Sequence, residues 1–453
     1  MLEKGKKYKF EIIDIGINFE GIAKTEEGLT VFIPGALKGE SVIGKIEKVN
    51  KSYALANIQE IANKSEHRCE AECTCYKKCG GCDAMHTTYE DTLEIKKQNV
   101  INTLKKQGID ENIVKDIYGM GNPYYYRNKV QYPVRNINGK NYMGMFSKGT
   151  HEIIQNDECL IQDKLTHEIA KRFYELLKDN FKGYNEKDLT GDIRNIMVRR
   201  GTHTKEIMCV LVVQDENIQY NKYLNQLVEC ITKEYSDISS IVLNINNKNT
   251  NVILSNKNIC IYGKEYITDI IGDYTFKITA DSFFQVNTLQ AEVLYNLLKE
   301  GLKLEKEKTL LELYSGVGTI GIFLSDAVKD IYAVEIVESA VLAAKENANL
   351  NNVKNIIHVN GDATEETLKL KKQGKTFDYI VVDPPRKGLD NQGVELILEL
   401  EPEKIGYVSC NPATLARDLK ILEEKYIIKE INLVDMFPWT SHVETVAVLN
   451  IKK

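Results

Sequence analysis

From about residue 271 onward, apolar stretches of strand length alternate with segments of helical pattern. These segments are, in chain order, "TLLELYSG", "DIYAVEIVESAVLAAKENANL", "NIIHVNGD", "FDYIVVDPP" and "KIGYVSCN". Apolar strands that are separated by helices are typical of a parallel sheet covered on both faces. We therefore predict that residues 271–453 form an α/β domain built on a doubly wound, Rossmann-like sheet.

A glycine-rich loop follows the first of these expected strands, in "LELYSGVGTIG". Residues 316–321 spell G-x-G-x-x-G, which is a weak signal alone and leaves a nicotinamide dinucleotide as one candidate ligand. Three acids favour S-adenosylmethionine instead: Glu312 before the loop, Glu335 at the end of the second strand and Asp362 after the third. Acids at successive strand ends suit a ligand that carries an amine and a sulfonium, so the pattern indicates a class I methyltransferase domain.

The fourth and fifth expected strands end on residue types that often take part in catalysis. "DPPRKGL" follows the fourth, and Arg386 occupies the place where enzymes that methylate amide or exocyclic nitrogens usually have an aromatic ring. Cys410 ends the fifth, with Asn411 as an expected N-cap and Pro412 as the first helical residue. A helix N-terminus lowers the pKa of a nearby thiol, so we expect Cys410 to be a nucleophile rather than a buried structural cysteine.

Glu444 begins the last expected strand, in "FPWTSHVETVAVL". His442 lies two residues before it. On pattern alone, Glu444 is as often an exposed strand residue as a catalytic base.

The first 60 residues alternate apolar and polar positions and are broken by glycines, which predicts a small closed β-barrel. A helix is expected over 90–108, ended by Gly108, and it could pack on the catalytic domain. Residues 120–270 are predicted to be mostly strands with one helix near 163–178. These patterns divide the chain into residues 1–62, 63–270 and 271–453.

The charge pattern favours an RNA partner in spite of a net charge of -6. From residue 117 to 151 there is no acid, but there are five Lys or Arg residues and six tyrosines. Cations for phosphates and rings for stacked bases suit an unpaired RNA strand, whereas the alternative is an exposed edge of a β-domain. No apolar run is long enough to span a membrane and no signal peptide is visible, so we expect a cytoplasmic protein.

Five of the ten cysteines lie within residues 69–82, "CEAECTCYKKCGGC". In a reducing compartment this favours metal ligands or catalysis over disulfides. The spacing Cys75-x3-Cys79-x2-Cys82 also matches the motif of radical S-adenosylmethionine enzymes. Gly81 stands where those enzymes usually have an aromatic residue, and residues 120–270 do not have the pattern of repeated βα units, so this alternative is disfavoured.

Taken together, these segments resemble the RNA (uracil-5-)-methyltransferase family over essentially the whole chain. The resemblance rests on "DPPRKGL", "YVSCNPATLARDL", "FPWTSHVETV", "SFFQVN" and a start that resembles the RNA-binding TRAM domain. It implies a mechanism in which a cysteine adds to uracil C6, C5 takes a methyl group from S-adenosylmethionine, and a base removes the C5 proton. The chain departs from the family at Trp439, usually Gln, His or Tyr, and at Gly406, usually aliphatic.

The resemblance assigns roles position by position. Cys410 matches the nucleophile, Glu444 the base and Phe283 an aromatic beside the extruded uracil. The basic "YYYRNKVQYPV" segment, with Arg127 and Lys129, matches a substrate-binding region. The positions that match the cofactor site are Gln285, Tyr314, Glu335, Asp362 and Asp383.

The resemblance also implies an iron–sulfur cluster. Cys73-x5-Cys79-x2-Cys82 matches the ligand run of the iron–sulfur members, and Cys159 in "NDECLIQD" matches their distant fourth ligand. Four thiolates could equally hold zinc, which the spacing does not exclude. We expect a [4Fe–4S] cluster in a central, β-rich α+β domain, with a structural role.

Within the family, a TRAM domain together with four such cysteines favours 23S rRNA as the substrate, with tRNA as the second candidate. A protein of another class, an RNA-binding or assembly factor with an inactive methyltransferase fold, is disfavoured because both Cys410 and Glu444 are present. The sequence indicates no obligate protein partner.

Overall fold

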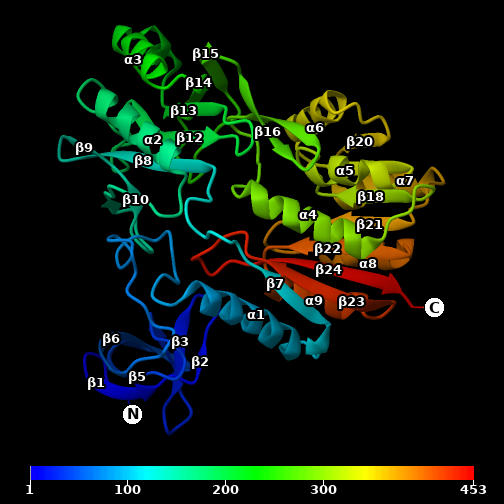
Figure 1. The fold of residues 1–453 in the computed structure, drawn as a ribbon, viewed down its shortest axis with the longest axis horizontal. Coiled ribbons are helices and arrows are strands. Elements are labelled where there is room, and N and C mark those ends of the chain that lie inside the picture. Colours follow the sequence, from blue (N-terminus) through cyan, green and yellow to red (C-terminus); the bar gives the residue numbers. More distant parts are fainter. Residues whose placement is uncertain (1, 453) are drawn as a thin grey trace.

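The computed structural model describes residues 2–452, which form three large β-sheet units. Helix α1 (Tyr89–Lys106) follows the first of these units in the chain. Figure 1 shows an N-terminal barrel in blue, a central sheet in green above it, and a third sheet in yellow to red beside both. Among the described residues, no helix combines the length and apolarity needed to cross a membrane.

The N-terminal unit is a six-stranded barrel in the order β1-β5-β6-β4-β3-β2. The β1 segment pairs with β5, and β2, a few residues further along the same chain segment, pairs with β3. This first segment therefore bridges both ends of the sheet and closes it, as the alternating pattern predicts. The strands are β1 (Lys7–Glu11), β2 (Asp14–Ile15), β3 (Glu20–Lys24), β4 (Thr30–Pro34), β5 (Ser41–Val49) and β6 (Tyr53–Asn63).

The central unit is a six-stranded sheet in the order β15-β14-β13-β12-β8-β9. Two helices, α2 (Lys164–Leu177) and α3 (Lys222–Glu234), pack on it through one apolar core. The first helix is the predicted one, and the second was not predicted. The strands are β8 (Lys129–Ile137), β9 (Lys140–Met143), β12 (Ile193–Arg200), β13 (Ile207–Val213), β14 (Ile238–Ile245) and β15 (Asn258–Gly263).

Two small antiparallel pairs accompany the central sheet. One consists of β10 (Met145–Phe146) and β11 (Ile153–Ile154), and it lies next to the cysteine-rich loop, where Cys79 bridges to Ser147. The other consists of β16 (Tyr266–Ile271) and β17 (Tyr274–Thr279), which lead into the third unit.

The third unit is an eight-stranded sheet in the order β20-β19-β18-β21-β22-β24-β23-β7, in which only β24 runs antiparallel to its neighbours. The predicted alternation of strands and helices is therefore confirmed. The strands are β18 (Thr309–Leu313), β19 (Asp330–Glu335), β20 (Ile356–Asn360), β21 (Tyr379–Val382), β22 (Lys404–Ser409), β23 (Tyr426–Val434), β24 (Glu444–Ile451) and β7 (Val114–Tyr118).

Helices cover both faces of this sheet, as expected for continuous apolar strands. One apolar core joins the sheet to α4, α5 and α6, and a second joins its other face to α1, α7, α8 and α9. The bounds of these helices are α4 (Thr288–Leu302), α5 (Thr319–Leu324), α6 (Glu338–Leu350), α7 (Ala363–Lys372), α8 (Asn391–Leu400) and α9 (Pro412–Leu422).

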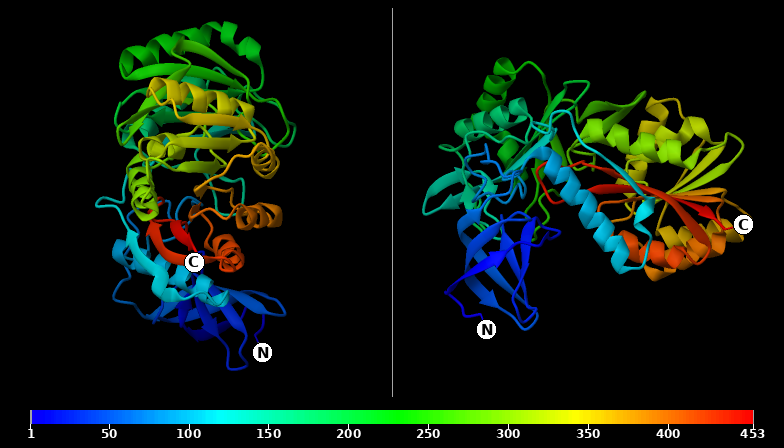
Figure 2. Two further views of the ribbon diagram at one scale, coloured as in Figure 1. Left: turned by 90° about the vertical axis from the view of Figure 1, so that its right-hand side faces the viewer. Right: turned by 60° about the horizontal axis from the view of Figure 1, so that its bottom comes forward.

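Helix α1 and strand β7 lie in the range expected for the central unit, but they belong to the third. Strand β7 pairs with β23 at the sheet edge, and α1 packs against β7 and α9 (Figure 2). Lys96 of α1 forms a buried ion pair with Asp435, just after β23. The catalytic sheet is thus completed by residues that precede the central sheet in the sequence.

Candidate active site

The glycine-rich loop lies between β18 and α5, as the sequence predicts. Gly316 and Gly318 have φ values of 54° and 83°, the left-handed region that glycine adopts at least cost. Tyr314 shares this conformation, with a φ of 63°, and is half-buried. The loop is held by Glu335, whose Oε2 accepts a hydrogen bond from the Gly316 N–H at 2.9 Å.

Glu312 lies beneath this loop with an unusual environment for an acid. Its side chain is buried, Oε1 accepts from the Gly321 N–H at 3.1 Å, and Oε2 has no hydrogen-bond partner among the described residues. A Cβ atom on Gly321 would lie 2.3 Å from that oxygen, so any larger residue there would displace the Glu312 carboxylate. Burial, followed by the charges of Asp383 and Glu335, raises the pKa of Glu312 to about 8.

The other expected cofactor residues line the same edge of the sheet with different exposure. Asp383 directly follows β21, and burial raises its pKa to about 7. Asp362 is exposed and caps α7, with Oδ1 accepting from the Thr364 and Glu365 N–H groups. An unpartnered buried carboxylate oxygen, a glycine without room for a side chain and several raised pKa values together fit a cationic ligand such as S-adenosylmethionine.

Cys410 and Glu444 are brought together by strand register. Ser409 of β22 pairs with Thr445 of β24. Because the strands are antiparallel, Cys410, which follows Ser409, faces Glu444, which precedes Thr445. The Thr445 hydroxyl fixes this register by donating to the Ser409 carbonyl at 2.8 Å. The side chain of Asn411 caps α9 as predicted, by accepting from the Ala413 N–H.

The electrostatics of this pair differ from the expectation. Burial, and then the charges of Glu444 and Asp383, raise the pKa of the Cys410 thiol to about 11, so the predicted lowering by the helix terminus is wrong. Burial also raises the pKa of Glu444 well above its usual value. Arg386 acts in the opposite direction on both groups. Burial and the nearby acids raise the pKa of this thiol by more than one helix dipole lowers it.

A cavity of about 210 Å³ opens at Cys410. Arg386 and His442 line it from the catalytic unit, Lys96 lines it from α1, and Ile17 and Asn18 reach it from the β2–β3 loop of the barrel. The barrel thus contributes to the wall around Cys410, which the sequence did not indicate.

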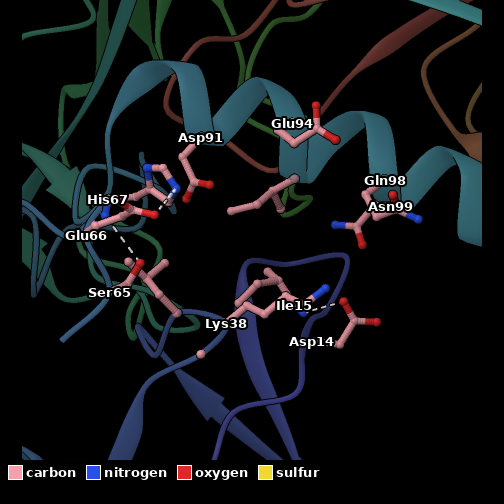
Figure 3. A pocket seen from close by; sticks show the side chains of 13 residues that line it. Asp14, Ile15, Lys38, Ser65, Glu66, His67, Asp91, Glu94, Gln98 and Asn99 are labelled. Carbon is pink, nitrogen blue, oxygen red and sulfur yellow. Dashed lines mark hydrogen bonds and ion pairs between the residues drawn. The ribbon is translucent and has the colours of Figure 1, made fainter. Parts of the chain in front are cut away.

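An adjoining groove of about 460 Å³ lies between the barrel and α1, and Asn99 borders both spaces (Figure 3). Asp14 and Lys38 enter the groove from the barrel side, and Asp91 and Glu94 enter it from α1. The barrel is held there by a hydrogen bond of 3.1 Å from Asn99 Nδ2 to the Gly16 carbonyl.

The loop of "SFFQVN" presents Phe283 with 73% of its surface exposed. Asn128 holds this loop by donating to the Gln285 carbonyl at 3.0 Å, and the buried Arg199 donates to the carbonyls of Thr279 and Ser282. Sequence reasoning missed Arg199. It pairs with Lys129 across β12 and β8, and burial together with this neighbouring cation lowers the pKa of Lys129 to about 8.

The cysteine-rich loop forms a second, separate candidate site. Five thiols line one cavity of about 20 Å³. They belong to Cys73, Cys75, Cys79, Cys82 and Cys159. In their present orientation, no three His, Cys, Asp or Glu side chains of the described residues form a group that could hold a metal ion. Cys69 lies apart, with its thiol directed at the Met85 carbonyl.

Burial raises the pKa of Cys73, Cys79, Cys82 and Cys159, and this favours the neutral thiols in the free protein. The Gly81 N–H donates to the Cys79 sulfur at 3.4 Å. Nearby backbone N–H groups act against the rise in the pKa of Cys73 and Cys159. The cation of Arg127 lies near Cys82 and Cys159 and acts against the rise in their pKa that burial causes. The thiol of Cys75 instead points at the Gln155 carbonyl at 3.6 Å. The donor set fits a metal or cluster in chemistry, although the cavity must widen to hold one.

Comparison with known proteins agrees with this architecture. A sequence model of the TRAM domain matches residues 2–58, and the model of the tRNA (uracil-5-)-methyltransferase family matches residues 88–452. An RNA methyltransferase of Clostridium acetobutylicum is 43% identical over 99% of this chain and 98% of its own, and one of Halalkalibacterium halodurans is 40% identical over 100% and 98%.

A solved structure is similar over nearly the full length. The crystal structure of Pyrococcus abyssi tRNA (uracil-54, C5)-methyltransferase in complex with S-adenosyl-L-homocysteine aligns with a TM-score of 0.78 at 28% identity. The alignment covers 98% of this chain and 100% of that one.

The fold and the acidic crevice define a class I S-adenosylmethionine-dependent methyltransferase that carries an N-terminal TRAM domain. Within that class, the chain belongs to the tRNA (uracil-5-)-methyltransferase family and is an RNA (uracil-5-)-methyltransferase.

Proposed function

We propose that this enzyme methylates C5 of a uridine through a covalent adduct between Cys410 and uracil C6. The observation that carries this proposal is the register of β22 and β24, which sets Cys410, a residue of the cavity wall, opposite the buried Glu444. Addition of the thiolate to C6 gives an enolate with electron density at C5. Glu444 then removes the C5 proton from the methylated adduct, and elimination breaks the bond between sulfur and C6.

The cofactor role is assigned to the acidic edge of the sheet. S-adenosylmethionine, when bound, supplies the methyl group. Glu335 and Tyr314 of the glycine-rich region, together with Gln285, Asp362 and Asp383, are the residues that we assign to it. The raised pKa values of Glu312 and Asp383 support a cationic ligand, because such a ligand stabilises their charged forms.

For the RNA, we propose a path that starts at the cavity of Cys410. The exposed Phe283 would stack on or beside the extruded base, since a base inside a duplex cannot reach the nucleophile. The barrel, residues 1–62, and the central unit, with Arg127 and Lys129, would bind the flanking strand. The cavity at Cys410, which the barrel and α1 both line, supports this arrangement.

The substrate that we propose is 23S rRNA, on the combination of a TRAM domain with four matching cysteines. A second candidate is tRNA, because a protein with the same overall architecture is a tRNA (uracil-54, C5)-methyltransferase.

We also propose that Cys73, Cys79, Cys82 and Cys159 hold a [4Fe–4S] cluster as a structural element of the central unit. The gathering of these four sulfurs around one cavity supports this ligand set, as does the Gly81 N–H that donates to Cys79, since such donors stabilise thiolates. Metal and sulfide analysis of anaerobically purified protein tests it, and zinc without sulfide would contradict it.

The decisive experiment for the reaction uses RNA in which uridine is replaced by 5-fluorouridine. Fluorine at C5 cannot leave as a proton, so the adduct should persist and migrate slowly in a denaturing gel. Parallel fragments of 23S rRNA and tRNA identify the substrate, and Cys410→Ala is the matched control. No adduct on either RNA with the wild-type protein would contradict the mechanism.

A further inference from the structure

The loop of residues 435–443 connects β23 to Glu444, and contacts with other segments of the chain hold its conformation. Trp439 has a φ of 65°, in the left-handed region that costs a bulky residue about 1 kcal/mol or more. A loop that contains such a residue keeps its shape only when its neighbours hold it. The neighbours therefore decide where the proposed base at the end of the loop lies.

Side chains from three other segments hold the first half of this loop by its backbone carbonyls. Asn287 donates to the Met436 carbonyl at 3.1 Å, and Lys96 donates to the Phe437 carbonyl at 3.1 Å. Tyr126 donates to the Pro438 carbonyl, also at 3.1 Å.

The cysteine-rich segment holds the second half of the loop through hydrogen bonds to its backbone. The backbone N–H groups of Asp83 and Ala84 donate to the Trp439 carbonyl at 2.8 and 3.1 Å. The side chain of Asp83 accepts from the Ser441 N–H at 3.1 Å through Oδ2, and its other oxygen pairs with Lys148. These contacts lie three residues from Glu444 on one side and one residue from Cys82 on the other.

We propose that Asp83 is a positioning residue that latches the catalytic loop to the thiol site, so that occupancy of this site controls the order of the loop ending at Glu444. The inference rests on the proposed roles of Glu444 and of the four cysteines. The latch consists of the Asp83 and Ala84 N–H groups, the Asp83 carboxylate, the Trp439 carbonyl and the Ser441 N–H. Cys82, as a ligand of an occupied site, would fix the chain next to Asp83, and an empty site would free the latch.

The chain contains a built-in reporter of this latch, because Trp439 is its single tryptophan. Its side chain is 5% exposed and packs between Tyr89 and Tyr124, with ring centroids 5.4 and 5.3 Å away. Release of the loop should shift the emission of Trp439 to longer wavelength and increase its quenching by acrylamide. Both readouts are independent of methyl transfer.

The test compares Asp83→Ala with the wild type and with Asp157→Ala, which removes an exposed carboxylate on the protein surface. In Asp83→Ala we expect at least twofold stronger acrylamide quenching and about a tenfold lower kcat, with KM for RNA within about twofold. Asp83→Asn should lie close to the wild type, because its side-chain oxygen can still accept from Ser441. Wild-type quenching in Asp83→Ala would overturn the latch, as would equal quenching in the Ala and Asn variants.

A second measurement on the wild-type chain removes the dependence on variants that could fold poorly. Hydrogen exchange of peptides that span residues 438–443 is compared before and after iron is removed with a chelator. We expect at least threefold faster exchange after removal, and unchanged exchange would overturn the coupling. If quenching and hydrogen exchange change as expected but no RNA forms an adduct, the proposed reaction is wrong and the latch is supported. If an adduct forms but quenching and exchange do not change, the reaction is supported and the latch is wrong.

Discussion

Cofactor binding should release protons from the acidic crevice. At pH 7, a carboxyl group with a pKa of about 8, as for Glu312, is about 90% protonated, and one with a pKa of about 7, as for Asp383, is about half protonated. A cation beside them favours the ionised forms and lowers both pKa values. We therefore expect S-adenosylmethionine to displace about one proton per molecule bound at pH 7.

Isothermal titration calorimetry in buffers of different ionisation enthalpy measures this number as the slope of the binding enthalpy against the buffer enthalpy. S-adenosylhomocysteine lacks the sulfonium charge and should release fewer protons. Glu312→Gln should reduce the slope by about half or more, whereas Glu399→Gln, at an exposed site paired with Lys371, should leave it unchanged. A binding enthalpy that does not depend on the buffer, or an equal slope in Glu312→Gln, would refute the reasoning.

Three further predictions concern the reaction and stability. Glu444→Gln should accumulate the Cys410 adduct on unmodified RNA, because proton removal from C5 becomes the slow step; denaturing gels would detect it. Lys96→Met should lower the free energy of unfolding in urea by about 3–5 kcal/mol, because Asp435 is left buried without its cation, and adding Asp435→Asn should recover part of the loss. Since the pKa of Glu312 is higher in the folded protein, the folded state binds more protons between about pH 4.5 and 8. Stability should fall across that window by at most about 1.4 kcal/mol per pH unit, and Glu312→Gln should flatten this slope in urea unfolding followed across pH.

Much of the catalytic sheet could be predicted because its signals are local. The apolar strands and the cap formed by Asn411 and Pro412 all lie within short windows of sequence, and the structure has them where expected. Strand β7 was not predicted to join this sheet, since "VKDIY" carries little apolar pattern and its partner β23 lies some three hundred residues later. Edge strands of this kind are defined by their partners more than by their own residues.

The burial of certain charged residues was the second feature that the sequence did not predict. Lys96 lies in a helix of mostly charged and polar residues and meets Asp435 from 339 positions away. Arg199 is also a buried cation, and its guanidinium donates hydrogen bonds to carbonyls of a loop about eighty residues later. Polar patterning predicts exposure for such residues, so only the tertiary structure shows that they hold the site together.

The protonation state of Cys410 also depends on residues that only the tertiary structure brings together. The sequence identifies a thiol at a helix N-terminus, and the dipole there does favour a thiolate. The strand register also sets Glu444 against the same thiol, with Asp383 nearby, and these two acids and the burial dominate in the free protein. We therefore expect a cation bound in the crevice to lower the pKa of Cys410 and so favour the thiolate that our proposed mechanism needs.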